Sequence, residues 1–446
     1  MIKTEFRTIV TEVPHPKALE MADRLAAVES HSMHGQLPVV WDRAVGSSVY
    51  DPWGNRWIDF TSTIFVANAG HAHPLIVDAI VKTAQKPLLH AYNYPTAERL
   101  NYLEELIRVT PSYLEKAFLV SAGTEAIEVA IKLMRMNAMA AGKRRSVVVS
   151  FEGNWHGRTT GAQHLSSNVD QRSWIGHEDP GVLRLPFPYP WIAEATSDPR
   201  GFFRETLQRE LDARGWTLKD DIAGFMLETY QGWGAVFYPA DFVKEVERAA
   251  KESGGLLVFD EMQAGFARTG ELFGYQHYGV QPDLVCCGKG ASSSVPLAFV
   301  LGSGYLLDLP SVGSMSSTHS ANPISCAAGL ANLKAIENEG LIERARDLGL
   351  QFHAELNSIA NASPAVSSIQ GLGMVAAIIT NGVGDADASA IATEISWECM
   401  RQGLLVVHTG RESVKIAPPL TIALDAMIEG LSVLRKVIDD VTAKHS

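Results

Sequence analysis

Short apolar runs alternate with helical patterns over most of the chain. Between them, apolar residues recur at helical spacing, for example over residues 124–140 and 241–252. Apolar strands separated by helices are typical of a mostly parallel sheet with helices on both faces, so the pattern predicts an α/β fold. The predicted strands are residues 117–120, 146–150, 224–228, 256–260, 284–287 and 298–301.

The two ends of the chain are patterned differently. Residues 49–59 predict a hairpin, with turn residues at its centre. After residue 328 the pattern predicts a smaller α+β domain, to which the N-terminal hairpin returns. We therefore expect an N-terminal segment 1–70 that contributes to the small domain, a large domain 71–328 and a small domain 329–446. The predicted C-terminal elements are one helix over 331–360, strands at 374–380, 404–407 and 414–416, and helices at 388–401 and 424–441.

Composition narrows the class of protein. The 446 residues are 46% hydrophobic, enough for a large core, and the net charge of −12 argues against a nucleic-acid partner. No apolar run has the length of a membrane span, and the first ten residues lack the apolar stretch of a secretory signal. The four cysteines fit neither a zinc site nor a disulfide framework. We expect a cytoplasmic protein that acts on small molecules.

Two predicted strands end in charged residues. Lys289 follows residues 284–287, and Asp260 and Glu261 end the preceding predicted strand. A buried ionised group costs several kcal/mol unless it is paired. A cofactor between an acid and an amine would explain this arrangement, because a carboxylate can keep a pyridine nitrogen protonated while an amine forms a Schiff base with an aldehyde. The residues predict pyridoxal 5′-phosphate (PLP) chemistry.

A candidate phosphate site lies where a helix is predicted to begin after residue 120. Gly123 permits a sharp turn, and Thr124 adds a hydroxyl. The free amides and the dipole of a helix N-terminus favour a phosphate. An ordinary helix capped by Ser121 or Thr124 explains the same residues.

Several motifs in order resemble those of class III aminotransferases, PLP enzymes of fold type I, and most nearly 4-aminobutyrate and related ω-aminotransferases. Residues 259–270, followed by Pro282-Asp283 and Gly288-Lys289-Gly290, resemble the family signature. Residues 68–74, 151–159 and 318–323 resemble further family segments, so the resemblance covers nearly the whole chain.

The resemblance implies a seven-stranded, mostly parallel sheet and assigns residues around the cofactor ring. Lys289 would carry the Schiff base and move the proton at the substrate carbon. Asp260 would pair with the ring nitrogen, Gln263 would reach the phenolic oxygen, and Trp155 would stack on the ring, where the family usually has Tyr or Phe.

The resemblance also implies how the phosphate is held. Gly123 and Thr124 would bind it, and Thr318 would reach the phosphate of a neighbouring subunit. The implied assembly is a homodimer with shared active sites.

The substrate side departs from the family pattern. Trp233 stands where the family has a glutamate, and Lys415 stands where the family has the arginine that pairs with it. A lysine lacks the two-donor fork that an arginine offers a carboxylate. Arg158 is retained and is expected to bind a distal carboxylate of the substrate. Ile64 is also predicted to be a substrate residue. The alternative is that Lys415 is solvated and Trp233 fills core.

The sequence therefore predicts a ping-pong aminotransferase with a non-standard substrate, such as a bulky amine or an amino sugar. A racemase or epimerase on the same fold is the alternative, followed by a decarboxylase and a non-catalytic PLP-fold protein. No metal is expected, because His71 and His73 lack further ligands at metal-binding spacing. A nicotinamide enzyme is disfavoured because no G-x-G-x-x-G follows an early strand.

Overall fold

The computed structural model describes residues 1–166 and 169–446, and its largest sheet has seven strands in the order β6-β14-β13-β12-β9-β7-β8. Strand β14 is antiparallel to both of its neighbours, and the other four pairs are parallel, which confirms the mostly parallel sheet. Strand β8 is the one that the apolar pattern did not identify. The strands are β6 (Lys116–Val120), β7 (Val147–Phe151), β8 (Val182–Leu185), β9 (Ile222–Glu228), β12 (Leu256–Asp260), β13 (Leu284–Cys287) and β14 (Ala298–Gly302).

The central strands are apolar on both faces because helices cover both. Val258 belongs to the same apolar cluster as Ile127 of α5, whereas Phe259 belongs to the cluster that contains Phe242 of α11. Successive side chains of a strand point to opposite faces, so each central strand is an almost unbroken apolar run. The covering helices are α5 (Gly123–Ala140), α9 (Pro199–Arg214) and α11 (Ala240–Ser253).

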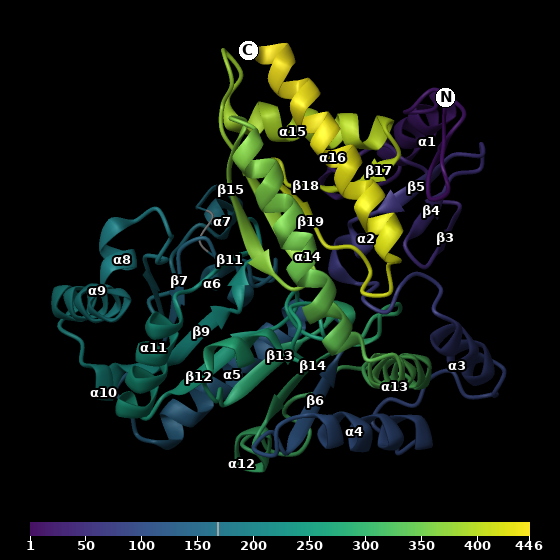
Figure 1. The fold of residues 1–446 in the computed structure, drawn as a ribbon. Coiled ribbons are helices and arrows are strands. Elements are labelled where there is room, and N and C mark those ends of the chain that lie inside the picture. Colours follow the sequence, from purple (N-terminus) through teal and green to yellow (C-terminus); the bar gives the residue numbers. More distant parts are fainter. Residues whose placement is uncertain (167–168) are drawn as a thin grey trace.

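The two ends of the chain meet beside this sheet (Figure 1). Strand β5 (Arg56–Asp59) pairs with β4 (Ser48–Tyr50) in the expected antiparallel hairpin and with β17 (Leu404–Leu405) in parallel. A four-stranded sheet in the order β15-β16-β19-β18 lies in the C-terminal part. Its strands are β15 (Val366–Leu372), β16 (Val375–Thr380), β18 (Val407–His408) and β19 (Ser413–Ile416). The division of the chain into domains stays a prediction.

The helical pattern expected over residues 331–360 is present but is divided between two helices. The chain forms α13 (Pro323–Asn338) and α14 (Leu341–Ala362), with Gly340 between them at φ +56°. A glycine in this left-handed conformation ends a helix, although the apolar pattern runs on beyond it.

The remaining elements are shorter or lie towards the ends of the chain. The N-terminal residues, in which the sequence showed little pattern, contain two short strands and a helix. None of the helices in the described part of the chain combines the length and apolar composition of a membrane span. These elements are β1 (Ile2–Lys3), β2 (Thr8–Ile9), α1 (Pro16–Ala26), β3 (Arg43–Val45), α2 (Ser62–Phe65), α3 (Pro74–Ala84), α4 (Ala97–Val109), α6 (Thr160–Leu165), α7 (Val169–Arg172), α8 (Ala193–Ser197), α10 (Leu218–Asp221), β10 (Tyr230–Gln231), β11 (Val236–Phe237), α12 (Gly304–Leu307), α15 (Ala388–Arg401) and α16 (Leu424–His445).

A buried arginine joins the segments that surround the carboxyl edge of the sheet. The guanidinium of Arg268 donates hydrogen bonds to Asn68 Oδ1 (2.7 Å), Ser62 Oγ (3.3 Å), and the carbonyl oxygens of Met374 (3.0 Å) and Pro418 (2.6 Å). Burial lowers the pKa of Arg268 to about 10, so it stays charged at neutral pH. One side chain thus connects the N-terminal segment, the large sheet and the C-terminal part.

Replacing Arg268 by methionine should lower the free energy of unfolding by about 3 kcal/mol, because buried oxygen atoms lose their donors. Urea unfolding of the cofactor-free protein measures this loss. Arg268→Lys is the matched control and should lose less, since an ammonium keeps the charge and some of the donors. Equal stability of Arg268→Met and the wild type would contradict the proposed link.

Candidate active site

Three ionisable side chains lie at the carboxyl ends of neighbouring strands. Asp260 ends β12 and lies opposite Glu228, the last residue of β9, and opposite Cys286 of β13. Lys289 follows β13 by two residues. Ligand sites of open α/β sheets lie at this edge, because parallel strands deliver their ends to it together.

Lys289 is held in a strained backbone conformation. Its φ is +41°, which is unfavourable for a residue with a side chain and is found mainly at functional sites. A Cβ atom on Gly288 would lie 2.6 Å from Met262 Sδ, and one on Gly290 would overlap the Asn68 amide, so a side chain at either position would displace a neighbouring side chain. Loss of hydration lowers the pKa of the Lys289 amine, although Asp260 and Glu228 oppose the shift. A lowered pKa makes a lysine a better nucleophile.

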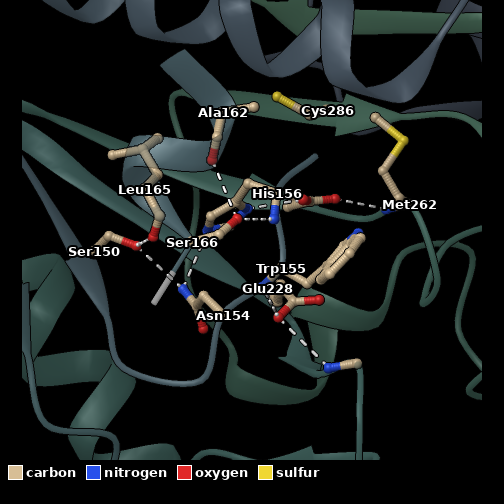
Figure 2. A network of polar contacts seen from close by, with 12 residues as sticks. Ser150, Asn154, Trp155, His156, Ala162, Leu165, Ser166, Glu228, Met262 and Cys286 are labelled. Carbon is tan, nitrogen blue, oxygen red and sulfur yellow. Dashed lines mark hydrogen bonds and ion pairs between the residues drawn. The ribbon is translucent and has the colours of Figure 1, made fainter. Parts of the chain in front are cut away.

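Hydrogen bonds fix the carboxylate of Asp260 on both oxygens. Oδ1 accepts from the Met262 amide (3.0 Å), and Oδ2 lies 2.9 Å from His156 Nδ1. Asn154 Nδ2 lies 3.1 Å from His156 Nε2, so an amide that donates there leaves the ring proton on Nδ1, facing Asp260. Figure 2 shows His156 within this network of polar contacts. His156 therefore fixes the position of the Asp260 carboxylate.

Glu261, next in sequence, is occupied locally. It accepts hydrogen bonds from the Gly274 and Tyr275 amides, both at 2.7 Å, and from the Thr229 hydroxyl. Its carboxyl group is fully buried, and burial raises its pKa to about 7. Asp260, which lies on the same edge as Lys289, stays the candidate acid of the site.

Helix α5 begins at Gly123, and no hydroxyl side chain caps its N-terminus. Its N-cap is Ala122, so capping by Ser121 or Thr124 is wrong. The Thr124 hydroxyl instead lies 2.7 Å from the Thr159 hydroxyl, an approach that Gly157 permits because a Cβ there would overlap Thr124. The first amides of a helix have no partner within it, so this end is suited to an anion.

Lys415 is buried, and a solvated Lys415 is therefore wrong. Its amino group donates hydrogen bonds to Gln263 Oε1 (2.8 Å) and to the Gly232 carbonyl, and lies 4.2 Å from the centre of the Phe65 ring. Burial lowers the pKa of Lys415 to about 7, against the attraction of Glu228. The structure thus brings Gln263 and Lys415 together.

Two aromatic residues of the site carry arginines on their faces. Trp155 donates its backbone N–H to Glu228 Oε2 (2.9 Å), and the Arg158 guanidinium lies 4.4 Å from its ring centre. The Trp233 indole N–H donates to Gln231 Oε1 (2.8 Å), and the Arg411 guanidinium lies 4.0 Å from its ring centre.

Ile64 and Thr318 lie apart from these contacts. Ile64 belongs to α2, in which four consecutive residues have positive φ, and it is 37% exposed beside a cavity of about 240 Å³. Thr318 is exposed, and its carbonyl accepts from His90 Nε2 (2.8 Å). Within the described part of this single chain, no recorded contact brings Thr318 to Lys289.

The residues present fit PLP. An amine of lowered pKa, a carboxylate with both oxygens fixed and a helix N-terminus without a hydroxyl cap lie on one edge of the sheet. The Glu125 carboxylate accepts from the Ser121 and Ala122 amides, which precede that helix. The amine, the carboxylate and the helix N-terminus match the aldehyde, the ring nitrogen and the phosphate of that cofactor.

Comparison with known proteins agrees with this chemistry. The sequence profile described as aminotransferase class-III matches residues 29–438. The chain belongs to the class III aminotransferases. It is a PLP-dependent transaminase of fold type I, as the motifs indicated.

Similar proteins cover almost the full chain. A 4-aminobutyrate aminotransferase of Mycobacterium leprae (strain TN) is 32% identical over 97% of this chain and 98% of its own. An alanine/serine racemase of Pyrococcus horikoshii is 30% identical over 99% of this chain and 94% of its own. The structure of an (S)-enantioselective omega-transaminase from Thermomicrobium roseum has a TM-score of 0.85 and is 26% identical, covering 95% of this chain and 99% of that one.

Sequence reasoning missed two contributors. The contact of His156 with Asp260 joins residues 104 positions apart, and the contact of Arg411 with Trp233 joins two separate elements. The aromatic-His-Gly-Arg-Thr segment was a signal for the first, whereas no motif marked the second.

Glu228→Gln should become more stable relative to the wild type as pH rises. Burial and repulsion by Asp260 raise the pKa of Glu228 from 4.5 to about 8. Between these values the unfolded chain ionises Glu228 while the folded protein holds its proton, so this group's contribution to stability falls with pH. Unfolding of the cofactor-free proteins at pH 5 and pH 8 measures the change. A difference independent of pH would show that folding leaves this pKa unaltered.

Proposed function

We propose that this transaminase acts on a substrate other than the standard ω-amino acid, such as a bulky amine or an amino sugar. The observation that carries the proposal is the engagement of Lys415 with Gln263 and Gly232. The Lys415 amino group already donates two hydrogen bonds inside the protein. Its remaining N–H could make only one contact with a substrate, whereas an arginine fork makes two with a carboxylate. A substrate without a carboxylate at this position suits such a site.

An aromatic wall beside Trp233 supports a large substrate group. Trp191 stacks on Tyr189 with ring centres 4.6 Å apart, and Tyr189 meets Trp233 edge-on at 6.2 Å. The Tyr189 hydroxyl and the Trp233 N–H both donate to Gln231 Oε1, at 2.6 and 2.8 Å. Their polar tips are therefore satisfied inside the protein. One face of Trp233 carries Arg411, so an apolar or sugar group would meet the rest of its ring surface.

Lys289 and Asp260 carry the reaction in this proposal. PLP, when bound, supplies an aldehyde for the Schiff base and a ring that accepts electron density. The Lys289 amine would hold the cofactor covalently and, once a donor amine has taken its place there, would be free to move the proton at the substrate carbon. Asp260, fixed by His156 and the Met262 amide, holds a proton on the ring nitrogen.

The other residues hold the cofactor and the substrate. Gln263 faces the phenolic oxygen, Trp155 lies against the ring, and Gly123 and Thr124 bind the phosphate. We further propose a homodimer in which Thr318 reaches the phosphate of the neighbouring subunit, because its exposed position leaves it free to meet a second chain.

Substrate contacts come from Ile64, Arg158, Trp233 and Lys415. Arg158, whose guanidinium lies on Trp155, can bind a distal carboxylate by turning away from that ring. The donor amine leaves as a carbonyl compound, and a second carbonyl compound then receives the nitrogen, in a ping-pong sequence.

Lys289→Ala should lose covalent PLP and turnover by at least about a thousandfold, because no other amine takes its place. Borohydride reduction of the native holoprotein should fix a phosphopyridoxyl group on Lys289, detected by peptide mass spectrometry. The exposed Lys82→Ala is the matched control and should be labelled like the wild type. Labelling elsewhere, or full activity of Lys289→Ala, would remove the mechanism.

Half-reactions with a panel of amines test the substrate class. Conversion of the lysine-bound cofactor to the pyridoxamine form, followed by absorbance, should be faster with bulky amines than with glutamate. Mass spectrometry of the carbonyl products identifies the donor. A fast reaction with glutamate and none with bulky amines would refute a non-standard substrate.

Trp233→Ala should lower kcat/KM for a bulky amine by about tenfold, because it removes ring surface worth about 1.5 kcal/mol. A small amine should be affected less. Trp233→Phe keeps an aromatic face and serves as the control. An equal loss of kcat/KM for both amines would show that Trp233 does not contact the large group of the substrate.

Racemisation or epimerisation is the second candidate, favoured by the similarity to an alanine/serine racemase. It requires return of the proton to the opposite face of the carbon. Incubation in deuterated water distinguishes isomerisation from transamination. Deuterium uptake with inversion and without nitrogen transfer selects the isomerase.

A further inference from the structure

The amide of Gln263 is held at one end by a buried amine. Lys415 lies on β19, in the C-terminal sheet, and only 4% of it is exposed. Its Nζ donates to Gln263 Oε1 at 2.8 Å, although the two residues are 152 positions apart. A second hydrogen bond to the Gly232 carbonyl and contact with the Phe65 ring at 4.2 Å fix the position of this amine.

This contact determines which way the amide faces. A glutamine side chain has an acceptor end and a donor end, which can exchange by rotation of the amide. In its ammonium form Lys415 has only donors, so the oxygen of Gln263 then faces Lys415, as the 2.8 Å contact has it, and Nε2 faces the other way. Gly232 provides the room, because a Cβ atom there would overlap Gln263 Nε2.

We infer that Lys415 is a positioning residue, which turns the Gln263 amide so that its N–H donors face the phenolic oxygen of the cofactor. The inference rests on the proposed placement of Gln263 beside that oxygen. With the opposite rotamer, an amide oxygen would face an oxygen that carries negative charge, which is repulsive. A lysine at position 415 thus acts on the cofactor through Gln263.

The absorbance of the lysine-bound cofactor provides the readout. A hydrogen-bond donor at the phenolic oxygen stabilises the negative charge on that oxygen. The oxygen then holds the neighbouring Schiff-base proton less tightly. Loss of the donor should therefore raise the pH at which this absorbance changes. The measurement is a pH titration of holoprotein without substrate, together with the affinity of the cofactor-free protein for PLP.

A double-mutant cycle separates positioning from packing. Lys415→Met and Gln263→Ala should each raise the titration midpoint and each weaken PLP binding, by up to about tenfold for one lost hydrogen bond. Because Lys415 acts through Gln263, the double variant should match Gln263→Ala alone. An additive effect of Lys415→Met in the Gln263→Ala background, or no shift in the wild-type background, would overturn the inference.

Two conservative variants keep the test informative if Lys415→Met folds poorly. Lys415→Arg retains a donor and should return the midpoint towards that of the wild type. Gln263→Glu keeps an acceptor for Lys415 but has no donor, so it should raise the midpoint although the Lys415 contact persists. A Gln263→Glu midpoint equal to that of the wild type would contradict the inference.

Failure of this inference is distinguishable from failure of the proposed function. Borohydride labelling of Lys289 and the amine panel test the proposed function and do not depend on Lys415. If Lys289 is labelled and the cycle is additive, only the positioning by Lys415 is wrong.

Discussion

The guanidinium of Arg268 holds together the segments from which the site is built. It donates to oxygen atoms at positions 62, 68, 374 and 418, which belong to both ends of the chain. A buried charge is tolerated only where it is compensated, so these segments must meet in one arrangement. The strained turn Ser62–Phe65 persists under the same constraint, since the Ser62 hydroxyl receives from Arg268 and donates to the Ala417 carbonyl (2.6 Å).

Burial also sets the chemistry of the edge where Lys289 lies. The amines of Lys289 and Lys415 have lowered pKa values, and Glu228 has a raised one, because all three have lost hydration. The two amines nevertheless differ in their partners. Lys415 is tied to Gly232 and Gln263, whereas Lys289 stands between two glycines in a strained conformation. The two amines thus share similar electrostatics but differ in how far their hydrogen-bonding capacity is already used.

Much of the architecture followed from the sequence because the sheet is covered on both faces. Continuous apolar runs placed six strands of the large sheet, and the charged residues that end β12 and follow β13 marked its reactive edge. Strand β8 was missed because only alternate residues are buried in it, and Gly340 divided a helix that the apolar pattern left whole. The pattern of apolar residues along the chain does not show where the backbone favours a turn.

Contacts between segments far apart in the chain could not be predicted from the sequence, for a different reason. Nothing near Lys415 indicates that its amine reaches Gln263, and nothing near Arg411 indicates that it covers Trp233. Such contacts depend on how the C-terminal sheet is placed against the large one. Motifs supplied the candidate residues for the cofactor, whereas tertiary packing determined what surrounds them.

The pairing of β5 with β17 joins residues 58–59 to residues 404–405. Lys415 and the Pro418 carbonyl, which complete the surroundings of Gln263 and Arg268, come still later in the chain. During synthesis, β5 can pair with β4 early, whereas its parallel neighbour β17 is made only after most of the chain. The surroundings of Gln263 and Arg268 are therefore completed by the last segments of the polypeptide to leave the ribosome.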